Sequence, residues 1–594
     1  MEFGSSAGKH RGGASCLVLF LWLGTLPALP VAAAPPDAES EALLSTLSAP
    51  ARASYKALFG VGSIAELNRV EIDVDIDPSK NGIRGTAKLS VRNTSHTTLS
   101  EFVLRLWPNS AGAGRAMSIS EVRSKSGPQK FEWKSDSVVS VPLEKPARPG
   151  DFMNIETGFA AKVPELGEEQ TNLYAQAIEQ MLKMLAGGGG KPASTDYGVF
   201  ASGHGIMNLG GFYPAPAYLG SGGWETDESN GLGDFSSGPP ANYFVSIMTP
   251  PGYKAATPGR VFKSVETGDG RVRQYVIACG VRDFVIELSS KFATKTETYD
   301  GVAITAYYLP ADAKAGARVL RVAKDAFTFY SRKFATYPYA DLKVVEAPLT
   351  GGAGGVEFPG LVTIAGMFMH EERDTGAGDF FAVKLPGDLR DDMLDFIVAH
   401  EVAHQWWNAM VGSNPRVHPW VDEALASYSS VLYFDQVYGT ARGKRLMDTQ
   451  IRLNYQMMRL FGGQDRPVGN PASSYNSMLD YAGIVYGKAP MFHHAIRETI
   501  GVKAYADACK EYARRFAFKT ASPGSFVATT GSLYPNFKQK LEALEKRWIK
   551  ETHGDEDIGQ PDLMALVQLV TGQSLDGDVK QFMEELFPMM KQYR

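Results

Sequence analysis

The chain has 594 residues, of which 44% are hydrophobic and 21% charged. These fractions are typical of a globular protein and argue against wholesale disorder and against a polytopic membrane protein. Lys and Arg number 60 against 65 Asp and Glu, a net charge of −5, so the chain lacks the cationic surface that nucleic-acid binding requires. At about 100–200 residues per domain, the length predicts two to four domains.

The first 34 residues have the order of a secretory signal peptide. A basic segment, Lys9–Arg11, precedes the apolar run 16–23, and a Pro-broken stretch ends in small residues. The apolar run is much shorter than the roughly 20 residues of a bilayer-spanning helix. We therefore predict cleavage after Ala33 or Ala34, preferably Ala33, and an exported, periplasmic or secreted protein without a stable membrane span. An uncleaved anchor is the alternative.

Residues 35–60, rich in Ala, Pro and Ser, are predicted to be a linker with a short helix. Apolar and polar residues then alternate over 70–76 and 87–91, with a turn between them, which predicts a β-hairpin. Similar short strands recur to about residue 288, so we predict a mainly antiparallel β domain over 61–308. A helical, Gly-rich insertion at about 164–195 interrupts it; its apolar stripe either packs on this domain or contacts a partner or a membrane.

Helices dominate the predicted second domain, 309–594. A long amphipathic helix is expected over 311–333, followed by a strand at 342–346, a Gly-rich segment at 351–360 and another strand. A helix with Asp388 as its N-cap then continues to Met410. Once the signal peptide is removed, the chain keeps two cysteines, Cys279 and Cys509, which form either one disulfide or two buried thiols.

A metal-binding motif lies inside this last helix. His400 and His404 are four residues apart and project from one helical face, so two imidazoles can bind one ion. Glu401 is about 100° around the helix, where it can reach a metal-bound water but cannot be the third ligand. Eighteen residues separate His404 from Glu423, which a second helix positions as the third ligand of a His₂Glu zinc site. A helix this apolar would bury these groups at a high cost without a metal.

Four segments in order resemble the alanyl aminopeptidase group of gluzincin metallopeptidases, peptidase family M1, which includes the leukotriene-processing hydrolase. The first is Gly354–Phe358 (GGVEF), which is similar to the family's Gly-x-Met-Glu-Asn loop, with Val356 and Phe358 as departures. The other three segments that resemble this family are His400–Trp407 (HEVAHQWW), Trp420–Tyr428 (WVDEALASY) and Tyr486–Ala489 (YGKA).

The resemblance implies an α+β multidomain fold, in which a saddle-like antiparallel β domain precedes a thermolysin-like, mainly helical catalytic domain with a small sheet. It also implies one zinc ion per chain, bound by His400, His404 and Glu423, and catalytic roles for Glu401 and Tyr486. Tyr486 would stabilise the transition state as a neutral donor, with Tyr481 as the rival for this role.

For the substrate, the resemblance implies that Glu357 binds the free α-amine of a peptide. The neighbouring Gly354, Gly355 and Val356 would let an extended peptide approach the strand edge. Asn208 is the nearest candidate for a second amine-binding group from the β domain, and a solvated loop carboxylate is the alternative interpretation of Glu357.

The sequence therefore predicts a zinc aminopeptidase acting on peptides. One alternative is a zinc endopeptidase or other hydrolase without free-amine recognition, which the altered Gly-rich loop favours. Another is a catalytically silent zinc-containing binding domain, which the presence of Glu401 and Tyr486 argues against. The oligomeric state and the preferred amino-terminal residue stay open.

Overall fold

The computed structural model describes residues 36–110, 114–172, 176, 197–235, 238–370 and 387–561. The predicted signal peptide and most of the predicted insertion at 164–195 lie outside these residues. Among the residues described, no helix combines the length and the apolar character needed to cross a membrane.

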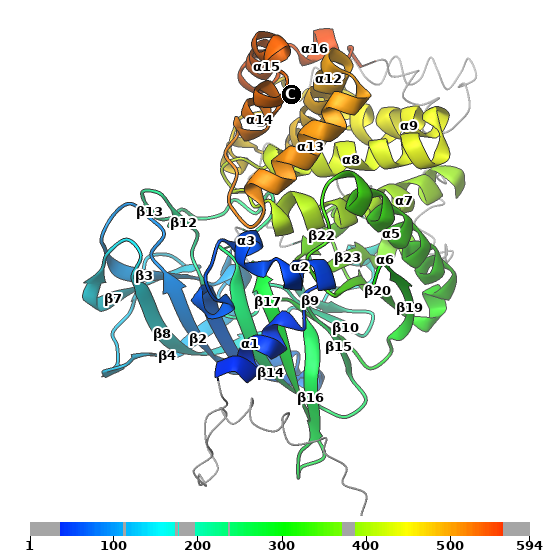
Figure 1. Cartoon of the computed structure of the whole chain (residues 1–594). Helices are drawn as coiled ribbons and strands as arrows, with labels where there is room; N and C mark the ends of the chain where they lie inside the picture. Colours follow the sequence, from blue (N-terminus) through cyan, green and yellow to red (C-terminus); the bar gives the residue numbers. More distant parts are fainter. Residues whose placement is uncertain are drawn as a thin grey trace, which may run out of the picture.

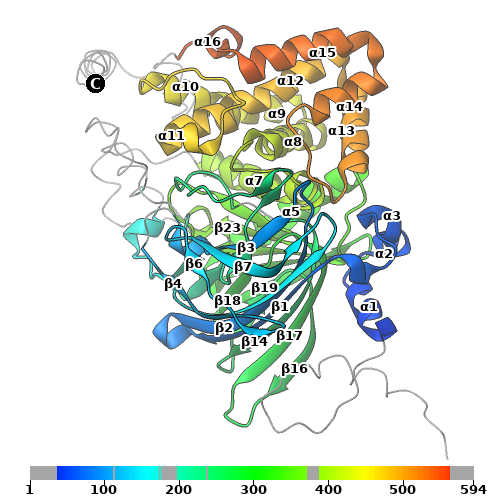
Figure 2. The same cartoon turned by 90° about the vertical axis from the view of Figure 1, so that its left-hand side faces the viewer.

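The N-terminal half is β-rich and the C-terminal half is helical, as predicted (Figures 1 and 2). The largest sheet has eight strands in the order β16-β17-β14-β1-β2-β8-β4-β5. Its pairs are antiparallel except for β1 and β14, and β1 with β2 forms the predicted hairpin. Its strands are β1 (Asn68–Asp77), β2 (Gly82–Arg92), β4 (Met117–Ser124), β5 (Gly127–Pro128), β8 (Phe152–Lys162), β14 (Ala241–Thr249), β16 (Arg260–Glu266) and β17 (Val272–Val281).

Three smaller sheets complete the β-rich part, which we define as residues 61–292. Two have four strands, in the orders β15-β18-β10-β9 and β11-β3-β7-β6, and one is the β12-β13 pair. Their strands are β3 (Leu99–Arg105), β6 (Glu132–Trp133), β7 (Val138–Ala147), β9 (Phe200–Gly203), β10 (Ile206–Leu209), β11 (Ala215–Pro216), β12 (Leu219–Gly220), β13 (Gly223–Trp224), β15 (Lys254–Ala256) and β18 (Ile286–Ser289).

A five-stranded sheet opens the helical part, which we define as residues 293–561. Its order is β19-β20-β21-β23-β22, with strands β19 (Ala293–Tyr299), β20 (Val302–Tyr308), β21 (Asp341–Ala347), β22 (Gly355–Phe358) and β23 (Leu361–Ala365). β20, β21 and β23 are parallel to one another. Because β19 and β20 pair within this sheet, the division between the two parts falls before β19 rather than at the predicted residue 308.

Helices pack on one side of this sheet and extend away from the β-rich part (Figure 1). They are α5 (Ala313–Lys333), α6 (Gly366–Met369), α7 (Gly387–Ala403), α8 (Trp420–Tyr438), α9 (Thr440–Leu446), α10 (Leu453–Leu460), α11 (Met478–Tyr481), α12 (Ala489–Ile500), α13 (Val502–Phe516), α14 (Ser525–Leu533), α15 (Lys538–Glu545) and α16 (Gly554–Asp557). Wider π-helical turns cover Gln405–Met410, Met447–Arg452, Ala482–Lys488 and Lys546–Lys550. Two of these turns lie beside the predicted metal ligands.

The segment predicted to be a linker is packed into the joint between the two parts. It forms α1 (Pro36–Leu44), α2 (Ala49–Ala53) and α3 (Tyr55–Phe59), and Leu43 and Leu47 are buried in the common core. The Ser48 N–H donates to the carbonyl of Pro338 at 2.9 Å. The segment predicted as a linker with a short helix therefore forms three short helices that pack against the folded core.

A buried arginine also joins the two parts. Arg282 follows β17, and its guanidinium donates to the carbonyls of Ala409 at 3.1 Å, Lys519 at 2.9 Å and Gly238 at 3.3 Å. The Lys519 carbonyl also accepts the Gly412 N–H at 3.0 Å. Buried carbonyls without a donor cost about 1–3 kcal/mol each, so the hydrogen bonds from this one side chain help to hold the two parts together. Cys279 and Cys509 are both buried and unbridged, so of the two alternatives the structure has free thiols.

Candidate metal centre

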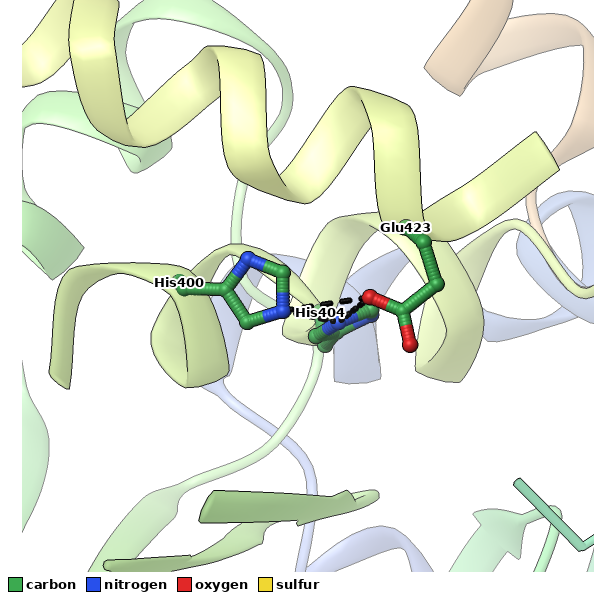
Figure 3. Close-up of side chains that lie close together, drawn as sticks. All are labelled: His400, His404 and Glu423. Carbon is green, nitrogen blue, oxygen red and sulfur yellow. Dashed lines mark hydrogen bonds and ion pairs between the residues drawn. The ribbon is translucent and has the colours of Figure 1, made fainter. Parts of the chain in front are cut away.

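α7 and α8 bring the three predicted metal ligands together (Figure 3). His400 Nε2 lies 3.1 Å from His404 Nε2 and 3.1 Å from Glu423 Oε2, and His404 Nε2 lies 3.3 Å from the same oxygen. All three side chains are buried. Helical spacing places the two imidazoles about one turn apart at the end of α7, with an angle of 84° between the ring planes, and Glu423 reaches them from the first turn of α8.

Two further contacts fix the imidazole rings. His404 Nδ1 lies 2.9 Å from the carbonyl oxygen of Trp407, and a carbonyl only accepts, so Nδ1 carries the proton. His400 Nδ1 lies 3.3 Å from Ser427 Oγ, one turn beyond Glu423 on α8. Outer contacts of this kind hold the Nε2 atoms of metal-binding histidines toward the ion.

The end of α7 explains the contact with Trp407. The sequence predicts a helix to Met410, but α7 ends at Ala403 and the chain continues as a π-helical turn, within which Trp407 has non-helical backbone angles (φ −107°, ψ 66°). The local break brings the Trp407 carbonyl to His404. The irregular turn therefore fixes the orientation of the His404 ring.

The cluster needs a positive charge at its centre. Glu423 Oε2 has no hydrogen-bond partner, although it lies against both imidazoles. Burial raises the pKa of Glu423, but His404 and His400 outweigh burial and lower it, so the carboxylate is ionised. Burial lowers the pKa of His400, which keeps that ring neutral. Burial lowers the pKa of His404, but Glu357 and Glu423 outweigh burial and raise it, so negative charge gathers around that ring. Two imidazoles and a carboxylate that converge in this way match the donor set of a His₂Glu zinc site.

Glu401 lies next to the cluster, packed against the Gly-rich strand β22. A Cβ added to Gly355 would lie 2.5 Å from Glu401 Cγ and 2.6 Å from its Oε1, so only glycine leaves room for this carboxylate. Glu401 is buried, and its Oε2 has no hydrogen-bond partner. Burial raises the pKa of Glu401; the charge of His404 opposes this, and the charges of Glu357 and Glu423 add to the rise.

Tyr486 contacts the cluster from the π-helical turn Ala482–Lys488. Its hydroxyl donates to Glu423 Oε1 at 2.7 Å, and its ring centroid lies 6.0 Å from that of His400. Burial and the Glu423 charge raise its pKa, so the phenol stays protonated. The ring of the rival, Tyr481, packs against the ring of Tyr486, with 5.8 Å between their centroids. The buried hydroxyl of Tyr481 has no hydrogen-bond partner. The structure thus brings Tyr486 into direct contact with a ligand.

Glu357 approaches the same cluster from β22. Its Oε1 lies 4.0 Å from His404 Nδ1, its side chain is 6% exposed, and it accepts a hydrogen bond from Asn408 Nδ2. The adjacent Val356 pairs with Thr363 on β23, and Gly354 packs against Ile397 of α7 so closely that a Cβ would lie 2.8 Å from it. The four predicted substrate-binding residues therefore line one edge of the site.

A further carboxylate, which the sequence did not reveal, belongs to the β-rich part. Asp234 is half-buried and lies close to Glu357 and Glu423: desolvation of its carboxylate first, and then those two charges, raise its pKa. Its Oδ2 has no hydrogen-bond partner. Asn208, the candidate from the sequence, instead donates its amide to the carbonyl of Gly198 within the β-rich part.

Two anchors hold the loop that carries Asp234. Asn230 Nδ2 donates to the carbonyl of Ala472 at 3.0 Å, and Arg416 pairs with Glu225 at 3.2 Å while donating to two carbonyls of the same loop. Gly233 adopts φ +77°, a conformation that glycine tolerates and other residues rarely adopt. The loop therefore reaches across the joint by tertiary contacts that no local spacing encodes.

Comparison with known proteins agrees with this geometry. Residues 318–548 match the model of the peptidase family M1 domain. Aminopeptidase M1-B of rice is 25% identical over 260 residues, which are 43% of this chain and 27% of the rice protein. Aminopeptidase N of Streptomyces lividans is 24% identical over 256 residues, 42% of this chain and 27% of its own. The helical part of the chain is therefore similar to the peptidase family M1 domain, the domain shared by these aminopeptidases.

Solved structures extend the likeness to both parts of the fold. The M1 zinc metallopeptidase of Deinococcus radiodurans aligns with a TM-score of 0.56 and 17% identity, over 84% of this chain and 95% of its own. A mutant of that enzyme bound to a Tyr-Ser-Ala substrate aligns with a TM-score of 0.54. The curated relatives are much longer, since the match spans only about a quarter of their length. The aligned Deinococcus radiodurans structures are those of zinc metallopeptidases.

We expect His404→Ala to abolish zinc binding at this cluster, because two of the three ligands do not make a closed site. The purified variant should contain one zinc equivalent per chain less than the wild type, as measured by plasma mass spectrometry. His96→Ala, which alters an exposed histidine, is the matched control and should keep the wild-type content. An unchanged zinc content in His404→Ala would refute the ligand assignment.

Proposed function

We propose that this chain is a zinc-dependent aminopeptidase that hydrolyses amino-terminal residues from peptides. The observation that carries the proposal is a pair of carboxylates, Asp234 and Glu357, which come from the two parts of the chain and interact with the charges of the His400, His404 and Glu423 cluster. The largest charge effects on these two groups come from other carboxylates and from His404. A substrate ammonium would supply the missing positive charge.

One zinc ion would be held at this cluster by His400, His404 and Glu423, whose converging donor atoms and unpartnered Oε2 suit it. When bound, zinc supplies Lewis acidity that polarises a peptide carbonyl and lowers the pKa of water. The remaining steps belong to side chains of this chain.

Glu401 is the proposed general base. Its Oε2 is free to accept a proton from the attacking water, and the same carboxyl group can then give that proton to the leaving amine nitrogen. Contact with Gly355 on one side holds the carboxylate in place. Burial raises its pKa, which makes its carboxylate a stronger base than an exposed glutamate.

Tyr486 is the proposed donor to the oxygen that gains charge as the carbonyl is attacked. Its hydroxyl is held 2.7 Å from Glu423 Oε1. The donor therefore lies beside a proposed zinc ligand before substrate binds. A neutral phenol donates a hydrogen bond without requiring a second cation in the site.

Glu357 and Asp234 are the proposed amine site, with Asn408 orienting Glu357. β22 is the edge strand of its sheet and pairs only with β23 in the described structure. An extended peptide could therefore add to the edge at Gly354, Gly355 and Val356. The amine site then fixes the register, so the bond cleaved is the first one.

A specific observation motivates the alternative of a zinc endopeptidase or other hydrolase: Val356 and Phe358 stand where the family loop has Met and Asn. A catalytically silent zinc-binding domain is the second alternative, and it would require Glu401 and Tyr486 to be idle. Peptides are the proposed partners in either enzymatic case. The oligomeric state is not part of the proposal.

Replacing Glu401 with Gln should lower kcat/KM at least about 100-fold, the usual contribution of a general acid–base group, while zinc content stays at the wild-type level. Aminoacyl chromogenic substrates would measure the rate. Normal turnover in this variant would contradict the assignment of the base. An inactive wild type with bound zinc would favour the silent-domain alternative.

Gly355→Ala should displace the Glu401 carboxylate without changing its chemistry, because the added Cβ would occupy the space of the Glu401 side chain. Its kcat should fall while zinc binding and thermal stability stay close to the wild type. Gly268→Ala, at a position where a Cβ meets nothing within 4 Å, is the control.

Acetylation of the substrate amine should lower kcat/KM at least about 30-fold, equivalent to about 2 kcal/mol, because it removes the charge that pairs with two carboxylates. Paired free and N-acetylated peptides of one sequence would measure this ratio. In Glu357→Gln and Asp234→Asn the ratio should shrink toward one. Equal cleavage of both peptides by the wild type would reject amine recognition and favour the endopeptidase.

We also propose export, on the order of residues within the first 34. The mature protein, recovered from the organism that makes it, should begin at Ala34. Amino-terminal sequencing would measure this directly. A protein that keeps the apolar run 16–23 would instead be the uncleaved, anchored form.

A further inference from the structure

A second cluster of metal-binding side chains lies away from the cluster described above. The five-stranded sheet has three neighbouring parallel strands, β20, β21 and β23 (Figure 1). Asp312 follows β20, Glu346 lies at the end of β21, and His370 follows β23 through α6. The carboxyl ends of parallel strands meet at one edge of a sheet, which is where open α/β sheets bind their ligands.

The three side chains converge at that edge. His370 Nδ1 lies 3.0 Å from Asp312 Oδ2 and 4.0 Å from Glu346 Oε1. One ligand atom from each residue lies within 4.8 Å of the other two. These separations resemble those between the donor atoms of the His400, His404 and Glu423 cluster, although they are slightly longer.

Glu346 shows that the cluster is incomplete as it stands. Its side chain is only 1% exposed. Oε2 accepts the Leu309 N–H at 2.8 Å, but Oε1, the atom that faces His370, has no hydrogen-bond partner. A buried carboxylate oxygen without a partner is costly, and a bound cation is one of the few groups that can compensate it.

The chain also leaves space beside this oxygen. Gly366 begins α6, and a Cβ at this position would lie 3.4 Å from Glu346 Oε1 and 3.1 Å from a ring atom of His370. Any larger residue would crowd the centre of the cluster. Asp312, with its side chain 4% exposed, closes the opposite side.

We propose that Asp312, Glu346 and His370 bind a second divalent cation. Two carboxylates and one imidazole form a mixed oxygen and nitrogen donor set, which suits Zn²⁺ or Mn²⁺. The site shares no residue with the His400, His404 and Glu423 cluster. It does not depend on the proposed peptidase activity.

Such an ion would connect the chain segments at the ends of β20, β21 and β23, which lie near β22, the strand that carries Glu357. β21 leads directly into the Gly-rich segment before β22, and β23 returns from it. A cation at the ends of β21 and β23 would fix both and thereby fix β22, which carries Glu357. Its proposed role is to position this strand rather than to contact substrate.

Metal titration of His404→Ala tests the proposal, since that variant removes a ligand of the first cluster. The full-length variant is stripped with a chelator, dialysed against ZnCl₂ or, separately, MnCl₂, and analysed by plasma mass spectrometry. We expect one equivalent per chain of at least one of the two ions and a rise in Tm on its addition. Both effects should disappear when Glu346→Gln is added.

Two further variants protect this test against misfolding. His370→Ala removes a partly exposed ligand and should also lose the ion. Glu287→Gln is the matched control, because Glu287 is a fully buried carboxylate with both oxygens unpartnered and no metal-binding group beside it in the described residues; it should keep the ion. If His404→Ala binds no more of either metal than the double variant does, a shared proton holds the cluster and the proposal fails.

Discussion

The convergence of two imidazoles and one carboxylate between α7 and α8 is the constraint around which the rest of the site is arranged. Three polar side chains are buried with their donor atoms 3.1–3.3 Å apart, an arrangement that is stable only with positive charge among them. The irregular turn after α7 and the position of Ser427 on α8 both serve to orient these rings. A cation such as zinc, bound among these donor atoms, would compensate the cost of burial.

The same constraint extends to the joint between the two parts. Asp234 can face Glu357 only if the β-rich part is held in a fixed position, and several buried contacts do this: Arg282 at the back of the joint, Arg416 and Asn230 at the loop. The helices of residues 36–59 fill the space between the parts. The proposed amine site therefore depends on the contacts that hold the two parts of the chain together.

Sequence reasoning predicted that His400, His404 and Glu423 lie together because their spacing is local. His400 and His404 are one helical turn apart, and the next helix begins with the segment that supplies Glu423, so 3.6-residue periodicity suffices. The β-hairpin was equally accessible from period-2 alternation. The break at Trp407 was missed because nothing in a run of apolar helix formers indicates that a carbonyl must turn back to an imidazole.

Asp234 and the cluster of Asp312, Glu346 and His370 were out of reach for another reason. Their members lie far apart in the chain and come together only through the pairing order of strands or through loop contacts across the joint. The boundary before β19 was missed for the same reason, since β19 and β20 look like any other hairpin in the sequence. Such placements depend on topology, which local patterns do not encode.

The central claim is that one zinc ion sits among His400, His404 and Glu423. Anomalous X-ray diffraction at the zinc absorption edge, from crystals of the purified protein, tests it most directly. The account predicts a single strong peak in this cluster, about 2.0–2.2 Å from each of the two Nε2 atoms and from a Glu423 oxygen. An ordered cluster without a peak, in crystals grown with zinc, would contradict it.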